Sequence, residues 1–301
     1  MDKKELIIKL NLKVALFLFS TNACLLFAHE KYSSIRVLGP DLEKIQIIQE
    51  IGIPLDHSTF RPGAYIEFVA TEKEKEILLK RGIDFEIIID NLTKYYQEQN
   101  VQAIERDFPL GSMQGNYTWS ELNARFYQLK NMYPNIISDK LVIGESLEGH
   151  DIWAFKLSDN PDQDENEPQV LYTGLTHARE PLSMMNLFYF IQHICENYIA
   201  GDDIEATYLV NERELWFIPV VNPDGYIYNE LIAPDGGGMH RKNRRDTGCG
   251  SGTEQGVDIN RNYGFNWGAN DTGSSPDPCY ATFRGDEPFS EPETRAVRDF
   301  I

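Results

Sequence analysis

The sequence predicts an α/β protein in which a mixed β-sheet flanked by helices is preceded by a small α+β module. Beyond residue 117, short apolar runs alternate with longer runs of helical periodicity, which is typical of an α/β domain. Residues 29–90 contain the order βαββαβ on their own, which indicates a ferredoxin-like, split-βαβ unit. Residues 91–116 are polar and lie between the two regions, so we interpret them as a linker.

Periodicity gives the elements of the small module. Thr71 and Glu74 have the spacing of a capping box and mark the start of the second helix. No ligand-binding motif is recognisable in the module, and we interpret His57 as a loop histidine. The expected order is strand 34–38, helix 41–51, a short strand near Leu55, strand 64–69, helix 75–81 and strand 84–89.

The larger region should begin with a helix that Thr118 and Glu121 cap and Pro134 ends. A turn, residues 222–225, should end its last predicted strand. The elements expected between them are a hairpin over 141–157, strand 169–175, helix 183–198 and strand 214–221. A final helix, which Ser290 and Glu293 should cap, continues to residue 301.

The N-terminus predicts a secretory signal peptide over residues 1–28. Basic residues precede an apolar stretch at 14–28, and residues 26–28 resemble a cleavage site. An uncleaved membrane anchor is the alternative. Cleavage would give a secreted or periplasmic protein without stable membrane association, in a compartment that permits disulfides.

Composition excludes one class of partner. The formal net charge is −19, whereas nucleic-acid binding needs a basic face. The chain has 301 residues with 42% hydrophobic content, enough for one good-sized core and a smaller one. The oligomeric state cannot be predicted from these data.

Signal cleavage would remove Cys24 and leave three cysteines. Cys249 and Cys279 lie in Gly/Ser/Pro-rich loops on either side of residues 258–262, so we expect them to form a disulfide. Cys195 lies in an apolar helix and is expected to be a buried free thiol.

A candidate metal site occurs where strand 169–175 ends. His177 and Glu180 are three residues apart there, and Pro181 can start the next helix. Strand ends in α/β sheets are common ligand sites, and zinc accepts an imidazole nitrogen and a carboxylate. The alternative is a histidine that is only hydrogen-bonded at a strand end. A second His-x-x-Glu pair, His193 and Glu196, lies within a helix and is interpreted as a solvated face.

A candidate carboxylate clamp lies in the segment Asp258-Ile-Asn-Arg-Asn262. Asn260 and Arg261 place an amide beside a guanidinium, and a guanidinium binds a carboxylate by paired hydrogen bonds. An Asx turn with a surface ion pair would explain the same residues. A metal beside such a clamp is typical of an enzyme that removes residues from the C-termini of peptides.

Four motifs in order carry a family resemblance: Thr176-His-Ala-Arg-Glu-Pro181, Asn222-Pro-Asp-Gly-Tyr226, His240-Arg-Lys-Asn-Arg244 and Val257-Asp-Ile-Asn-Arg-Asn262. They resemble the zinc metallocarboxypeptidases of the carboxypeptidase A/B type, in particular the secreted bacterial branch that includes carboxypeptidase T. The resemblance covers residues 108–301, about the first two-thirds of the family's catalytic domain, which we assign to 117–301. The module resembles the family's pro-domain, which implies a zymogen.

The resemblance implies a role for each matching residue. His177 and Glu180 would bind Zn2+, and Asp258 would accept the second ring N–H of His177. The remaining positions would contact a peptide substrate. Arg241 would polarise the scissile carbonyl, unless residues 241–245 are only a solvated basic run. Asn260 and Arg261 would hold the terminal carboxylate, and Arg179 would contact the peptide further from its end.

The resemblance also implies residues that lie beyond residue 301. In the family these are the third zinc ligand (a histidine), a tyrosine that closes over substrate, a specificity residue and the glutamate base. We therefore expect a chain ending at Ile301 to bind zinc poorly and to lack carboxypeptidase activity. The rival hypothesis is a non-catalytic truncated product that binds C-terminal carboxylates weakly.

A second cation site is a further hypothesis. The acidic loop from Asp162 to Glu167 spaces oxygen ligands as a Ca2+ loop does, and the carboxypeptidase T branch binds calcium in this region. The loop lacks the glycine of an EF-hand, and a plain solvated loop is the alternative.

Overall fold

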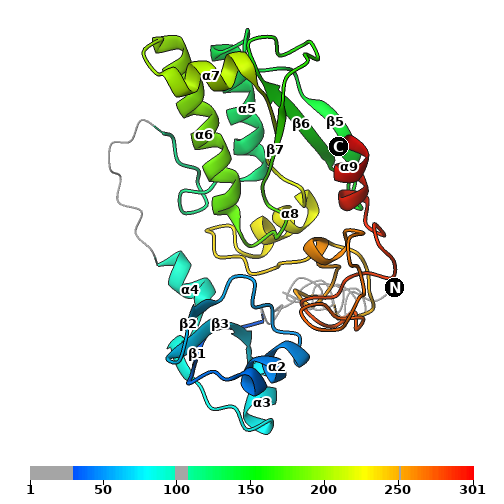
Figure 1. The fold of residues 1–301 in the computed structure, drawn as a ribbon. Coiled ribbons are helices and arrows are strands. Elements are labelled where there is room, and N and C mark those ends of the chain that lie inside the picture. The colour runs from blue at the N-terminus through cyan, green and yellow to red at the C-terminus, as the bar shows by residue number, and fades with distance from the viewer. Residues whose placement is uncertain (1–29, 99–107, 251) are drawn as a thin grey trace, which may run out of the picture.

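The computed structural model describes residues 30–98, 108–250 and 252–301. The predicted signal peptide and residues 99–107 of the predicted linker lie outside the described residues. Figure 1 shows the N-terminal module (residues 30–90, blue to cyan) beneath the larger domain. Within the described ranges, no helix is long and apolar enough to cross a membrane.

The N-terminal module is a four-stranded antiparallel sheet with two helices. Its strands lie in the order β2-β3-β1-β4, the order of a split-βαβ unit. Ile35, Ile48 and Phe68 lie in its core. The elements are β1 (Tyr32–Leu38), α2 (Leu42–Glu50), β2 (Thr59–Arg61), β3 (Tyr65–Thr71), α3 (Glu72–Lys80) and β4 (Glu86–Ile89). The short strand β2 begins at residue 59, not near Leu55. Residues 54–58 therefore form a loop that pairs with no strand of the sheet.

Part of the predicted linker is helical, which the sequence analysis did not predict. Helix α4 (Leu92–Gln97) begins at Asn91, whose side chain accepts a hydrogen bond from the N–H of Lys94. Leu92 is buried with Tyr32 of β1 and Met239 of the larger domain. The helix forms because its N-cap and one apolar contact outweigh the polar composition.

The larger domain has the mixed sheet that the sequence predicts. Its order is β5-β6-β8-β7, with β7 parallel to β8 and the other pairs antiparallel. Helices α5 to α7 cover one face around Phe126, Phe188 and Phe217, and α9 covers the other. The elements are α5 (Trp119–Met132), β5 (Leu141–Glu145), β6 (Asp151–Leu157), β7 (Gln169–Thr173), α6 (Pro181–Ala200), α7 (Ile204–Glu212), β8 (Glu214–Ile218), α8 (Pro223–Ile232), the short 3-10 helix η1 (Ile259–Arg261) and α9 (Pro292–Phe300).

Two helix starts differ from the sequence prediction. The segment 222–225 is not a simple turn: Asn222 caps α8 by accepting a hydrogen bond from the N–H of Gly225, and Pro223 occupies the first helical position. Helix α9 begins after Glu291, not Ser290, and no side chain caps it. Pro292 sets that start, because proline is favoured in the first turn.

The three cysteines among the described residues are one disulfide pair and one free thiol. Cys249 and Cys279 form a disulfide with Cα atoms 5.1 Å apart, and Cys195 is free and buried in α6. The disulfide joins the two loops that flank η1. Next to Cys279, the ring of Tyr280 packs on Gly52 of the module, so these loops also form part of the surface on which the module lies.

Candidate metal centre

The end of β7 turns sharply into the site. Leu175 is buried and has φ 47°, a left-handed conformation that is uncommon for a branched residue. Its carbonyl accepts a hydrogen bond from the N–H of Asn222, which extends the pairing with the chain after β8. Such backbone strain persists only where the surrounding structure fixes it, and here it directs the next residues, 176–180, away from the sheet.

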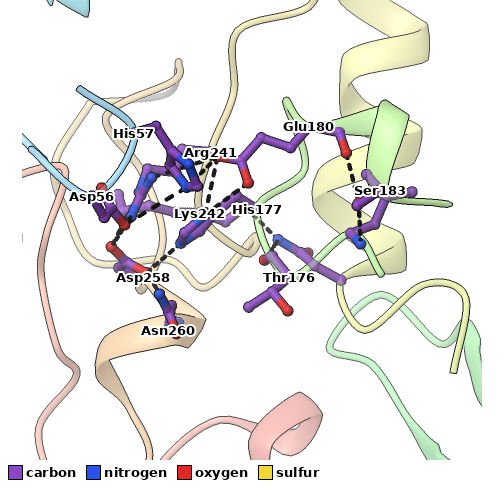
Figure 2. Close-up of polar contacts among 12 residues, drawn as sticks. Asp56, His57, Thr176, His177, Glu180, Ser183, Arg241, Lys242, Asp258 and Asn260 are labelled. Carbon is purple, nitrogen blue, oxygen red and sulfur yellow. Dashed lines mark hydrogen bonds and ion pairs between the residues drawn. The ribbon is translucent and has the colours of Figure 1, made fainter. Parts of the chain in front are cut away.

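His177 lies between two carboxylates (Figure 2). Its Nδ1 is 3.1 Å from both carboxylate oxygens of Glu180, and its Nε2 is 3.2 Å from Oδ1 of Asp258. His177 is 3% exposed and Asp258 is fully buried. Burial disfavours the charged ring, but the hydrogen bonds with Asp258 and Glu180 outweigh it and raise the pKa of His177.

This arrangement fits a metal ion. Both ring nitrogens of His177 face carboxylates, and without a metal only a doubly protonated ring satisfies both contacts. A cation at Nδ1 replaces that proton and lets the Glu180 carboxylate and the Nδ1 lone pair act together as ligands. Asp258 fixes the tautomer because it accepts the Nε2 proton. No side chain caps α6, so the Glu180 carboxylate is not engaged at the helix terminus.

Arg241 lies next to this pair and is 3% exposed. Its Nε and Nη2 donate to Oδ2 of Asp258 at 3.1 and 2.9 Å. Its Nη1 lies 3.8 Å from Oε1 of Glu180 and has no hydrogen-bond partner among the described residues. Burial disfavours the charged guanidinium, but the charges of Asp258 and Asp56 outweigh this effect and raise the pKa of Arg241. The site therefore holds a fixed positive charge with one donor unused beside Glu180.

The segment after Asp258 forms η1, and the side chains of Asn260 and Arg261 lie in different environments. Asp258 Oδ1 accepts a hydrogen bond from the N–H of Asn260, so the Asx turn considered above is present together with the His177 contact. Asn260 is exposed, whereas Arg261 donates from Nε to the carbonyl of Gly273 at 2.7 Å. This hydrogen bond fixes the guanidinium of Arg261, and its Nη2 faces the module.

Two module residues that the sequence analysis did not identify lie in the site. Oδ2 of Asp56 is 2.8 Å from Nη2 of Arg241 and 3.2 Å from Nη2 of Arg261. Desolvation opposes the ionised form, but the charges of Arg241 and Arg261 lower the pKa of Asp56. His57 was interpreted as a loop histidine, yet its Nε2 lies 3.2 Å from Oε1 of Glu180. An Asp-His pair in a short aperiodic loop is the only local signal, and it is a weak one.

Two features of the sequence analysis remain, Arg179 and the second His-x-x-Glu pair. Arg179 lines a cavity of about 510 Å³ that Glu180 and Met239 also line, on the α6 side of the pair. In the second His-x-x-Glu pair, His193 and Glu196 are exposed on α6, and His193 contacts Asn197. His193 and Glu196 therefore lie on the solvated surface of α6.

A comparison with protein-family models decides the family. Residues 122–301, more than half of the chain, match the model described as zinc carboxypeptidase. The chain belongs to the zinc carboxypeptidase family.

Two carboxypeptidases illustrate the range of similarity within the family. A zinc carboxypeptidase of Saccharothrix mutabilis subsp. capreolus is 40% identical over 167 residues, which are 56% of this chain and 36% of that protein. Human mast cell carboxypeptidase A is 26% identical over 282 residues, 88% of this chain and 63% of that protein. The chain thus spans between about a third and two-thirds of the length of these curated relatives.

The fold agrees with the family. Carboxypeptidase A from Helicoverpa armigera has a TM-score of 0.68 at 24% identity, covering 90% of this chain and 66% of that one. At this identity the likeness concerns the fold alone, and it confirms the predicted mixed α/β architecture. Zinc carboxypeptidase membership implies Zn2+ as the metal, and His177 with Glu180 provide donors of the type that zinc accepts.

Proposed function

We propose that this protein is a zinc-dependent metallocarboxypeptidase that hydrolyses the last peptide bond of peptides and proteins. One observation carries the proposal. The His177–Glu180 donor pair lies beside two arginines, Arg241 and Arg261, that together hold a carboxylate oxygen, that of Asp56. A site that joins a metal to a carboxylate clamp suits a substrate with a free C-terminal carboxylate.

Each residue has a separate task in this proposal. Zinc, when bound, would supply Lewis acidity at the scissile carbonyl and lower the pKa of a water molecule. Asp258 orients His177 and Arg241 at once, because its two oxygens accept from both. The unused Nη1 of Arg241 is available to the carbonyl oxygen as negative charge develops on it. Arg261 and Asn260 bind the terminal carboxylate, and Arg179 contacts the peptide in the adjoining cavity.

The N-terminal module is an inhibitory pro-domain in this proposal, and the chain is a zymogen. Its Asp56 carboxylate stands in for the C-terminal carboxylate of a substrate, because it forms ion pairs with Arg241 and with Arg261 of the clamp. A substrate carboxylate and Asp56 cannot occupy the same donors together. The module also packs Gly52 against Tyr280 and hydrogen-bonds Glu30 to Thr253, which supports a defined docked position.

The proposed function also includes a location and partners for the protein. Export through a signal peptide at 1–28 is supported by the basic and then apolar N-terminal sequence and by the Cys249–Cys279 disulfide, so the protein is secreted or periplasmic. Its partners are the C-termini of peptides or proteins. The net charge of −19 argues against nucleic acid as a partner.

The direct test is release of the C-terminal amino acid from a blocked dipeptide by the protein after proteolytic removal of the N-terminal module, with and without a zinc chelator. We expect turnover that the chelator and His177→Ala both abolish. Turnover that neither affects would contradict the proposal. A protein that binds the free acid in preference to its C-terminal amide, but does not turn it over, would support the rival function, a non-catalytic binder of C-terminal carboxylates.

Calcium is a second proposed ligand, at a cluster that overlaps the predicted loop through Glu165 and Glu167. The carboxylates of Asp159, Glu165 and Glu167 offer oxygens within 4.8 Å of one another. Oε2 of each glutamate has no hydrogen-bond partner among the described residues. Burial, and then the charges of Glu165 and Asp159, raise the pKa of Glu167, which a cation would relieve. Calcium titration of the wild type and of Glu167→Gln, followed by calorimetry, tests this site.

A further inference from the structure

His57 brings an imidazole of the module into contact with Glu180, one of the two metal donors. It lies in the loop between α2 and β2, and Figure 2 shows it above His177 and beside Arg241. Its Nε2 is 3.2 Å from Oε1 of Glu180, and its ring meets the His177 ring edge to face with centroids 5.6 Å apart. Ligand atoms of Asp56, His57 and His177 all lie within 4.8 Å of one another.

The neighbouring residue Asp56 does not have the same role. Its Oδ2 accepts from two guanidinium groups, Arg241 and Arg261, and those contacts satisfy its charge. His57 Nε2 lies 3.9 Å from Asp56 Oδ2, and its shorter contact is with Glu180. The loop therefore directs a carboxylate to the clamp and an imidazole to the metal donors.

The donor set around Glu180 is that of a zinc site. Nδ1 of His177 and Nε2 of His57 both face the Glu180 carboxylate, at 3.1 and 3.2 Å. Two imidazole nitrogens and one glutamate, with a fourth position open, form a common catalytic zinc set. From the sequence, His177 and Glu180 were the only two protein donors recognised, and that was the reason to expect weak zinc binding.

We propose that His57 is a zinc ligand in the precursor, so that one metal ion joins the N-terminal module to His177 and Glu180 of the larger domain. This inference rests on the proposed function for the His177–Glu180 pair. It adds that zinc tightens the docking of the module, and that docking tightens the binding of zinc, since linkage between the two is reciprocal. Removal of the metal then frees the loop that holds Asp56 in the carboxylate clamp.

The exposure of His57 makes a substitution informative. Its side chain is 58% exposed, so His57→Ala leaves no buried cavity. His193 is a control, because it is exposed as His57 is and, like His177, is followed three residues later by a glutamate. His177→Ala removes the donor on which the proposed function depends.

The experiment measures zinc affinity of the full chain by competition with a chromophoric chelator, for wild type, His57→Ala, His193→Ala and His177→Ala. X-ray absorption of the zinc-loaded wild type counts the imidazole ligands. We expect His57→Ala to weaken zinc binding at least as much as loss of an outer partner does, on the order of 10–100-fold. His193→Ala should leave it unchanged, and absorption should report one imidazole fewer in His57→Ala than in wild type.

Failure of this inference differs from failure of the proposed function. If His177→Ala abolishes zinc binding while His57→Ala binds zinc with wild-type affinity and wild-type imidazole count, His57 is not a ligand and the proposed function stands. If the wild type binds no zinc, or His177→Ala binds zinc normally, both the ligand role of His57 and the proposed function are contradicted. Circular dichroism of each variant checks that the fold is retained.

Discussion

Oδ2 of Asp56 lies 2.8 Å from Nη2 of Arg241, although the two residues are 185 positions apart in the sequence. The same oxygen lies 3.2 Å from Nη2 of Arg261. One carboxylate from the N-terminal module thus meets two guanidinium groups of the larger domain. This contact is the basis of the first three predictions.

Asp56→Ala should open the clamp to ligands. Loss of a hydrogen-bonded charge at two arginines should raise the affinity for a blocked dipeptide with a free carboxylate by roughly tenfold or more, because hydrogen bonds to charged groups contribute about 1.5–3 kcal/mol. Calorimetry measures this affinity. Asp84→Ala, at an exposed position of the same module, is the control and should leave it unchanged. Equal affinities for both variants and the wild type would count against the stand-in role of Asp56.

Docking of the module should weaken in acid. Desolvation disfavours the ionised form of Asp56, but Arg241 and Arg261 hold the pKa of its carboxyl below the ordinary value of 3.8. A carboxyl whose pKa is lowered by docking stabilises the docked state at a pH above its ordinary pKa. This stabilisation is lost as the pH falls through the lowered pKa. Small-angle scattering of wild type and Asp56→Asn should differ at about pH 5 and converge below pH 3.8. A difference that persists or grows in acid would contradict this.

Gly52→Ala should displace the module. A Cβ atom at this position would lie 2.4 Å from Cδ2 of Tyr280, and φ is +88°. Gly63→Ala is a matched control, since φ is +72° there but nothing lies within 4 Å of the added carbon. Both variants strain the backbone, but only Gly52→Ala should raise the affinity for the free-acid dipeptide. The same increase in Gly63→Ala would show that the effect comes from the module's own stability.

Glu293 should make stability fall as the pH rises. It is fully buried in α9 beside Glu291, its Oε1 has no hydrogen-bond partner among the described residues, and burial raises its pKa to about 7. A carboxyl whose folded pKa is raised from 4.5 contributes stability below 4.5 and loses it as the pH rises through 7.

The comparison with a glutamine variant isolates this effect. Glu293→Gln should gain stability over the wild type between about pH 5 and pH 8 by on the order of 1–3 kcal/mol, measured by urea unfolding. The exposed Glu287→Gln should show no pH-dependent difference. A pH-independent difference for Glu293→Gln would mean that the carboxyl is ionised throughout.

Sequence reasoning found the residues that local motifs mark. His177 and Glu180 follow a strand, so a local pattern points to the edge of the sheet, whereas the role of Asp258 was implied by the family resemblance. The structure brings these three together with Arg241 and Arg261. The mixed sheet was predictable for the same reason, because strand and helix periodicity are local properties.

The missed residues depend on how two folded units meet. Asp56 and His57 lie in a loop without periodicity, and their partners are in another domain. No local pattern encodes that docking. Helix α4 was missed for a related reason, since the burial of Leu92 against Tyr32 and Met239 is a long-range contact.

In the proposed function His177 and Glu180 hold zinc, and the chain contains its own control for this role. The second His-x-x-Glu pair, His193 and Glu196, has the same spacing on an exposed helix face. Zinc calorimetry of the full chain should give one site in the wild type and in His193→Ala/Glu196→Gln, and no site in His177→Ala/Glu180→Gln. Zinc binding that survives the loss of His177 and Glu180, or disappears with His193 and Glu196, would contradict the account.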